Sequence, residues 1–155
     1  MARSMDISPA KSVAFQIRRA HLAFDRLLTM RLNRHGIKSG FWHYLRALWI
    51  EEGLTQKRLS EITHVTEVTT VSLLNDMTHR GLIQRERDTA DRRQVFVSLT
   101  PKGRALKKRL LPYASELNKI AIRGIPKEDV ELCLVVFSKM ASNLEAEFKE
   151  TENPK

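Results

Sequence analysis

The chain has 155 residues, of which 42% are hydrophobic and 29% charged, and it carries a formal net charge of +9. This length suits one globular domain, and the excess of positive charge predicts an anionic partner, for which nucleic acid fits better than a membrane surface. The longest apolar run, residues 132–137, is far shorter than the roughly 20 residues of a membrane span, and the single cysteine excludes an internal disulfide or a cysteine-based zinc site. We therefore expect a cytoplasmic protein.

The first predicted helix covers residues 9–34, with Ser8 as its cap and Pro9 at its first position. Apolar side chains recur along it at spacings of three and four residues, and Gly36 is expected to end it. His21 lies beside this apolar stripe. It could be a structural or solvated histidine, or it could face a ligand cavity.

A second helix is predicted from Gly40 to Glu52, with Ser39 as its cap. Both tryptophans of the chain, Trp42 and Trp49, lie seven residues apart on it, so they should share a face. The simplest interpretation places these aromatics in the core. The same helix also offers apolar walls, a hydrogen-bond donor and a fixed cation at Arg46, which together suit a small aromatic carboxylate.

Residues 54–81 predict two consecutive helices joined by a tight turn. Thr55 should cap the first, and the second should run from Thr66 to Arg80 and end at Gly81. Helical geometry places two sets of side chains on opposite faces of the second helix: Thr70, Val71, Leu74 and Met77 on the buried face, and Thr69, Ser72, Asp76 and His79 on the polar face. The polar face suits the DNA major groove, which admits one helix, although solvated helix residues would look the same.

Residues 82–87 and 94–99 alternate like strands, so they predict a hairpin. Its polar tip, residues 88–93, projects several arginines, and arginine suits phosphate and a narrow minor groove. Asp91 is expected to orient Arg92 or Arg93 through a bidentate ion pair. A charge run alone would usually be a solvated turn, but directly after a polar-faced helix it predicts a wing.

Two helices are predicted after the hairpin. Thr100 should cap the first, Pro101 should begin it, Pro112 should kink it, and it should end at Gly124. The last helix begins near Pro126 and has an apolar stripe formed by Val130, Leu134, Phe137, Ala141, Leu144 and Phe148. Such a long stripe at the end of a small domain predicts pairing with the same stripe of a second subunit. Cys133, in this apolar helix, is expected to be a packed thiol rather than a redox sensor.

The segments LTQKRLSEI, TTVSLLNDMTHRGLI, RERDTADRRQVFVSLTPKGRAL and LLPYASELN resemble the MarR family of bacterial transcription regulators, over nearly the whole chain. The most specific part is Asp91-Arg92-Arg93 followed by Leu99-Thr100 and Gly103. The resemblance implies a homodimer that binds a palindromic operator, usually responds to a small molecule, and holds its effector beside the first two helices. Val68 and Ser72 depart from the family's usual residues, so no base preference is implied.

We therefore expect a mainly α protein with a small β-hairpin wing: a winged helix-turn-helix domain plus a helical dimerisation region built from the N- and C-terminal helices. Residues 1–155 should form a single MarR-type domain, with the DNA-binding region at 40–103 and the dimerisation helices at 8–36 and 104–150. The function most favoured is a repressor, released from double-stranded DNA by a small aromatic or phenolic acid. Alternatives are an architectural, sequence-tolerant DNA-binding protein, a repressor without an effector, and a winged helix that contacts proteins.

No catalytic constellation is present, the histidines lack metal-ligand spacing, and we expect no enzyme activity, cofactor, metal or membrane partner. The residues expected to contact DNA are Thr55, Thr66, Glu67, Val68, Thr69, Thr70, Ser72, Asn75, Arg85, Arg87, Asp91, Arg92 and Arg93. The residues expected to contact an effector are Arg18, His21, Phe24, Trp42, His43, Leu45, Arg46 and Trp49.

Overall fold

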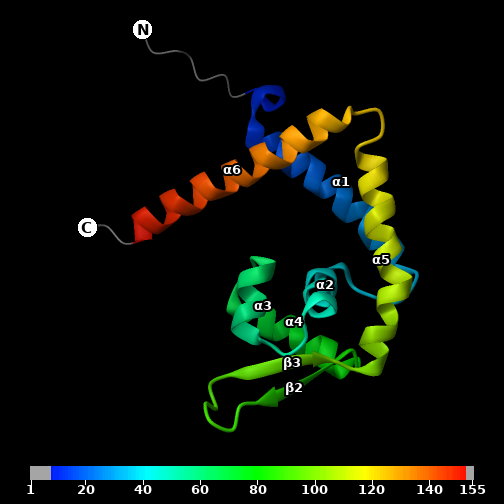
Figure 1. Cartoon of the computed structure of the whole chain (residues 1–155), viewed down its shortest axis with the longest axis vertical. Helices are drawn as coiled ribbons and strands as arrows, with labels where there is room; N and C mark the ends of the chain where they lie inside the picture. The colour runs from blue at the N-terminus through cyan, green and yellow to red at the C-terminus, as the bar shows by residue number, and fades with distance from the viewer. Residues whose placement is uncertain (1–7, 153–155) are drawn as a thin grey trace. The chain divides into compact units, whose positions relative to one another are not determined.

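The computed structural model describes residues 8–152, and the chain divides into two compact units between Leu117 and Asn118. The first unit holds a three-stranded sheet and the helices that cover it, drawn from blue to yellow in Figure 1. The second holds the last helix. The expected class, mainly helical with a small antiparallel sheet, is confirmed. No helix in the described part of the chain is both long and apolar enough to cross a bilayer.

The first helix begins later than predicted. Residues Pro9–Lys11 form a 3-10 turn (η1), and α1 then runs over Val13–Asn33. Ser12 separates them because its backbone is extended and its side chain accepts a hydrogen bond from the Phe15 amide at 3.3 Å. Gly36 follows the helix with a φ of 67°, as the sequence predicts.

The second helix is shorter than predicted, because Ser39–Phe41 form a 3-10 turn (η2) and α2 covers only Trp42–Ile50. Lys38, not Ser39, occupies the cap position of the 3-10 turn. The helix ends at Glu51, whose backbone is extended and leads into the first strand. Six of the nine α2 residues are buried, so this helix forms the centre of the core.

The next elements are α3 (Gln56–Thr63) and α4 (Glu67–His79), which are the predicted helix-turn-helix. The Thr55 hydroxyl accepts from the Arg58 amide at 3.1 Å, so the predicted cap of α3 is confirmed. His64 takes the left-handed conformation (φ 54°) that turns the chain between the helices. Gly81, with φ 66°, follows α4.

Strands β2 (Ile83–Arg87) and β3 (Val95–Leu99) form the predicted antiparallel hairpin, in a register that pairs Arg85 with Val97. A third strand, β1 (Leu54–Thr55), pairs with the other edge of β3 and gives the order β1-β3-β2. Two residues are too few for alternation to reveal a strand in the sequence. Figure 1 shows the hairpin (light green) extending past α3 and α4.

The last two helices are α5 (Pro101–Ala121) and α6 (Lys127–Glu152). The Thr100 hydroxyl accepts from the Gly103 amide at 3.1 Å, which confirms the predicted cap of α5, and the helix continues through Pro112. Gly103 lies against the sheet so closely that a Cβ there would stand 2.1 Å from the Leu82 carbonyl oxygen. Only glycine allows this approach, which brings the first turn of α5 against the start of β2.

The core is one cluster of apolar side chains in the first unit. Its largest fully buried members come from every α-helix of that unit, from η2 and from the hairpin with the residue before it: Leu32, Phe41, Tyr44, Leu45, Leu48, Leu59, Leu74, Met77, Leu82, Ile83, Leu99 and Leu110. Burial of this kind is worth about 25 cal/mol for each Å² of apolar surface removed from water. The core therefore holds α3, α4 and the hairpin in fixed positions.

Candidate nucleic-acid interface

The N-terminus of α4 is capped by Thr66, which also orders the neighbouring side chain. The Thr66 hydroxyl accepts from the Thr69 amide at 3.3 Å and donates to the Thr69 hydroxyl at 3.0 Å. A capped N-terminus carries partial positive charge, which favours a nearby anion. Both hydroxyls therefore lie fixed at an exposed helix end.

One face of α4 is buried against α2, and this corrects the prediction for Thr70. Thr70 is fully buried, and its hydroxyl hydrogen-bonds the Tyr44 hydroxyl at 2.9 Å. A buried hydroxyl needs such a partner, because leaving it unpaired costs about 1–3 kcal/mol. Thr70 is thus a structural residue of the helix-turn-helix and is not available to DNA.

The exposed face of α4 presents mostly short side chains in its first three turns: Glu67, Val68, Thr69, Val71, Ser72 and Asn75. Val71, expected on the buried face, is 38% exposed, because the core contacts of α4 are made by Thr70, Leu74 and Met77. Short hydroxyl and amide groups can approach base edges, and methyl groups can contact the thymine methyl. This face has the chemistry of a helix that enters the major groove.

Asp76 lies on the polar side of α4, where its carboxylate is bound by two cationic side chains of the same chain. Its carboxylate accepts hydrogen bonds from Lys38 at 2.5 Å and from the Arg80 Nε at 3.0 Å. These hydrogen bonds, first from Lys38 and then from Arg80, lower the pKa of Asp76 below its usual value. Asp76 is therefore occupied by contacts within the protein, and a contact of Asp76 with bases stays a prediction.

The tip of the hairpin is organised by two aspartates that bond to the backbone. Asp88 accepts from the Ala90 amide at 2.9 Å, and Asp91 accepts from the Arg93 amide at 3.0 Å and from the Gln94 side chain at 3.4 Å. The expected ion pair of Asp91 with an arginine side chain is therefore wrong, because short aspartates in turns bond more easily to the backbone two residues on.

The two arginines at this tip have side chains without a bonding partner in the described residues. Arg92 and Arg93 are exposed, and within residues 8–152 their guanidinium groups make no hydrogen bond or ion pair. Arg87, at the end of β2, is also exposed. Arg85 differs, because it is half-buried and donates to the Gln56 side chain at 3.1 Å. The wing thus combines a rigid backbone with unpaired cations.

Two hollows, of about 420 and 480 Å³, lie between α3, α4 and the hairpin. Gln56, Val71 and Val95 line both of them. The first also includes Lys57 and Arg93. Gln56, Lys57 and Val71 are lining residues that the sequence analysis missed, although the position of Gln56 and Lys57 directly after the Thr55 cap is a usable signal. The exposed face of α4 and the wing therefore border one concave surface.

The residues expected to bind an effector are divided between the core and the surface. Trp42, Leu45 and Trp49 are buried: the two indoles pack edge to face with centroids 6.0 Å apart, and Trp49 Nε1 donates to the Gly103 carbonyl at 3.1 Å. These three side chains form core, not the open walls of a pocket, which corrects that prediction. The seven-residue spacing correctly placed the two tryptophans on one face of the helix. Spacing alone does not distinguish a face packed in the core from one that lines a cavity.

The remaining expected effector residues are exposed on α1 and α2: Arg18, His21, Phe24, His43 and Arg46. Arg46 lies over the Trp42 ring, 5.8 Å from its centroid. Although much of the His43 residue is exposed, partial desolvation of its imidazole lowers its pKa, the charges of Arg46 and His21 lower it further, and Asp25 acts in the opposite direction. These exposed side chains give α1 and α2 a cationic, partly apolar surface. In the described part of the chain, no group of three or more metal-ligating side chains occurs.

Comparison with known proteins identifies relatives of the whole arrangement. A model of the MarR family matches residues 35–94. The chain is 30% identical over 144 residues to the HTH-type transcriptional regulator TtmR of Methylorubrum extorquens (strain PA1), covering 92% of this chain and 72% of that protein.

Solved structures show the same fold. A putative MarR family regulator from Listeria monocytogenes, complexed with 26mer DNA, has a TM-score of 0.84 at 16% identity, over 94% of this chain and 97% of that one. Bordetella bronchiseptica BpsR, whose DNA binding is regulated by 6-hydroxynicotinic acid, has a TM-score of 0.78 at 23% identity, over 85% and 94% of the two chains. At these identities the likeness concerns the fold.

Proposed function

Because the chain belongs to the MarR family of DNA-binding transcriptional regulators, we propose that it is a repressor that binds a palindromic operator as a homodimer and is released by a small aromatic acid. The observation that carries the proposal is the exposed face of α4 beside the unpaired arginines of the wing. In this assignment α4 enters the major groove and the wing reaches the neighbouring minor groove. Occupying the operator represses transcription without any chemistry.

Base contacts are assigned to the exposed face of α4. Thr66, Glu67, Val68, Thr69, Ser72 and Asn75 are the candidates, and Thr70 is excluded by its burial. Backbone and minor-groove contacts are assigned to Thr55, Arg85, Arg87, Arg92 and Arg93, with Asp91 holding the turn. The net charge of +9 supports the assignment, since phosphate contacts supply most of the sequence-independent affinity.

The homodimer is supported by α6. None of its 26 residues, all of which the structure describes, is buried in the single chain, and large apolar side chains such as Leu134, Phe137 and Leu144 are exposed. Exposed apolar surface of this extent marks an interface. A two-fold axis would then present two α4 helices to half-sites roughly 34 Å apart, one turn of DNA.

The test of DNA recognition is a fluorescence anisotropy titration with an operator selected from a pool of random duplexes. Arg92→Ala and Arg93→Ala should each weaken binding by about 1–3 kcal/mol. Arg123→Ala, an exposed arginine outside the assigned interface, is the matched control and should change little. If all three variants bind alike, the wing assignment is wrong.

Two further measurements separate the alternatives. For six to ten phosphate contacts, log affinity should fall against log salt with a slope of about −5 to −9. Similar affinity for the operator and for random duplex would favour the architectural, sequence-tolerant protein. An affinity insensitive to salt would favour a winged helix that contacts proteins.

The effector is assigned to the exposed surface of α1 and α2 formed by Arg18, His21, Phe24, His43 and Arg46. The regulation of BpsR by an aromatic carboxylic acid supports the ligand class. To release DNA, the ligand must bind the free dimer about 10- to 100-fold more tightly than the operator-bound dimer. Operator titrations with and without 6-hydroxynicotinic acid, in the native chain and in Arg46→Ala, measure this ratio. Equal affinities would leave a repressor without an effector.

A further inference from the structure

Four exposed side chains form a continuous strip on the outer face of α4: Val68, Val71, Ser72 and Asn75. Residues three and four apart are neighbours on a helix, so Val68 adjoins Val71 and Ser72, and both of these adjoin Asn75. The buried residues of α4 lie on the opposite side of the helix. The strip is therefore half apolar, although it belongs to the face that is assigned to DNA.

The two valines of this strip do little for the stability of the single chain. Val68 is 83% exposed and Val71 is 38% exposed, so neither is part of the core. β-branched side chains also lose rotamer freedom in a helix, so they favour α4 less than a polar helix former would. One exposed apolar residue is common on a protein surface. Two adjacent valines beside a cationic wing instead suit a partner that is anionic and carries methyl groups.

The major groove of DNA offers such methyl groups at one base. Thymine presents its 5-methyl group there, and apolar side chains recognise that group by direct contact. Adenine, the partner of thymine, presents a donor and an acceptor that fit the side-chain amide of asparagine. An A·T pair therefore matches the valines of the strip and also Asn75, at its far end.

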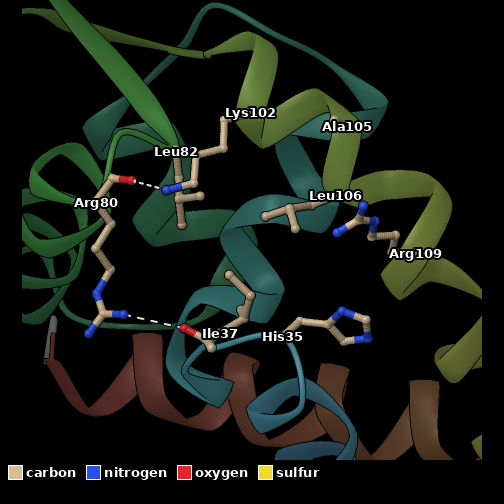
Figure 2. A pocket seen from close by; sticks show the side chains of 9 residues that line it. His35, Ile37, Arg80, Leu82, Lys102, Ala105, Leu106 and Arg109 are labelled. Carbon is tan, nitrogen blue, oxygen red and sulfur yellow. Dashed lines mark hydrogen bonds between the residues drawn. The ribbon is translucent and has the colours of Figure 1, made fainter.

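The usual readers of guanine are missing from α4. Arginine and lysine make the commonest specific contact, to O6 and N7 of guanine, and the sequence of α4 contains neither residue. Arg80, directly after the helix, donates to the Asp76 carboxylate at 3.0 Å and to the Gly36 carbonyl at 3.3 Å, and Figure 2 shows the second bond as a dashed line. Glu67, whose carboxylate could accept from cytosine, lines the first hollow beside α3. The strip on α4 is thus better equipped for A·T pairs than for G·C pairs.

We propose that Val68 and Val71 contact the 5-methyl groups of thymines in the major groove, so that the operator carries A·T pairs under the first turns of α4. The two valines are then specificity-determining residues, whereas contacts to phosphate hold DNA of any sequence. This inference rests on the proposed function, because it concerns the same helix and the same DNA. It adds which base pair the helix recognises and the chemical group by which it does so.

The experiment removes single methyl groups from the DNA. In the selected operator, each thymine is replaced in turn by deoxyuridine, in both half-sites at once, which deletes the methyl group and keeps every hydrogen-bonding group of the base. Fluorescence anisotropy with the native full-length chain should show binding about 15-fold weaker at one or two positions, or about fourfold for each methyl group. Val68→Ala should lose most of this penalty at one position, and Val71→Ala should lose it at another if there are two.

One variant and one modified base serve as controls. Ile50 is 84% exposed, like Val68, but lies at the end of α2 outside the assigned interface, so Ile50→Ala should keep both the affinity and the deoxyuridine penalties. A cytosine·guanine pair placed at a sensitive position should weaken binding. Replacing that cytosine by 5-methylcytosine, which restores only the methyl group, should recover about fourfold for each half-site.

Three results would overturn the inference. No loss of affinity at any deoxyuridine would show that methyl groups are not recognised, and equal binding of cytosine and 5-methylcytosine at the sensitive positions would show the same. Penalties that persist unchanged in Val68→Ala and Val71→Ala would assign the methyl contacts to other side chains. If the native chain still binds the operator and Arg92→Ala weakens it, such results leave the proposed function intact. Failure of the native chain to bind any duplex would overturn both.

Discussion

α4 and α6 both carry apolar side chains at spacings of three and four residues, but they use them differently. α4 packs Thr70, Leu74 and Met77 into the core of its own chain, and α6 buries none of its residues, all of which are described. The apolar face of α4 is covered by the core of its own chain, so the opposite face of α4 is exposed and can contact a ligand. The apolar face of α6 is left exposed in the single chain. Periodicity therefore identifies the face of a helix but does not say what covers it.

The largest effect should come from a charge placed on the α6 face. Phe137→Glu would bury two unpaired carboxylates in a two-fold interface, so the dissociation constant of the proposed dimer should rise about a thousandfold, or ~4 kcal/mol. Sedimentation velocity at micromolar concentration measures it. Lys139→Glu, two residues away and outside the stripe, is the control and should remain dimeric. If Phe137→Glu also stays dimeric, α6 is not the interface.

Shortening one apolar side chain on α4 and one on α6 compares how much each face contributes to the free energy of unfolding. Leu74→Ala removes a fully buried side chain and should lower the free energy of unfolding by about 2–5 kcal/mol. Leu144→Ala, at a side chain that is 72% exposed, should cost less than about 0.5 kcal/mol. Urea unfolding of both, made in the Phe137→Glu background to remove association, gives the values. Equal costs would mean that α6 packs within its own chain.

A smaller effect is expected at the hydrogen bond between α2 and α4. Tyr44→Phe leaves the buried Thr70 hydroxyl unpaired and should destabilise the protein by about 1–3 kcal/mol. The double variant with Thr70→Val should recover much of this loss, because neither polar group then remains. Operator affinity should be reduced by Thr69→Ala, on the exposed face, and hardly changed by Thr70→Val. The opposite order would contradict the placement of the two faces.

The smallest effect concerns pH. The pKa of Asp76 is lowered by its hydrogen bonds to Lys38 and Arg80, so its ionised form is favoured in the folded state. Its contribution to stability is therefore complete above its usual pKa of 3.8 and is lost as the pH falls through the lower folded value. Unfolding measured from about pH 5 downward should show Asp76→Asn converging on the native chain.

The sequence predicted what depends on local pattern. The helix-turn-helix, the hairpin and the caps at Thr55 and Thr100 all follow from hydroxyls, glycines and alternation, and the structure confirms them. Thr66, expected as the first residue of its helix, is instead the cap. The sequence-based predictions were wrong where a residue distant in the chain determines which contact a side chain makes. Thr70 differs from Thr69 only because Tyr44 lies opposite it, and Asp91 bonds backbone instead of arginine.

Pockets were the least predictable feature for the same reason. The tryptophans of α2 looked like cavity walls, and they are core because α5 brings the Gly103 carbonyl to Trp49. The cavity lined by His35, Arg80, Lys102 and Arg109 (Figure 2), in contrast, collects residues from positions 35 to 109, and no local motif joins them. Tertiary contact alone creates that cavity.

The close approach at Gly103 has a mechanical consequence. The Leu82 carbonyl accepts from the Thr100 amide at 3.0 Å and from its hydroxyl at 3.1 Å, and the bare Gly103 backbone lies against it. Backbone atoms set this spacing, so no change of side-chain rotamer can loosen it. The first turn of α5 and the base of the hairpin must therefore translate and tilt as one rigid piece. A displacement of the start of α5 therefore carries the base of the hairpin with it.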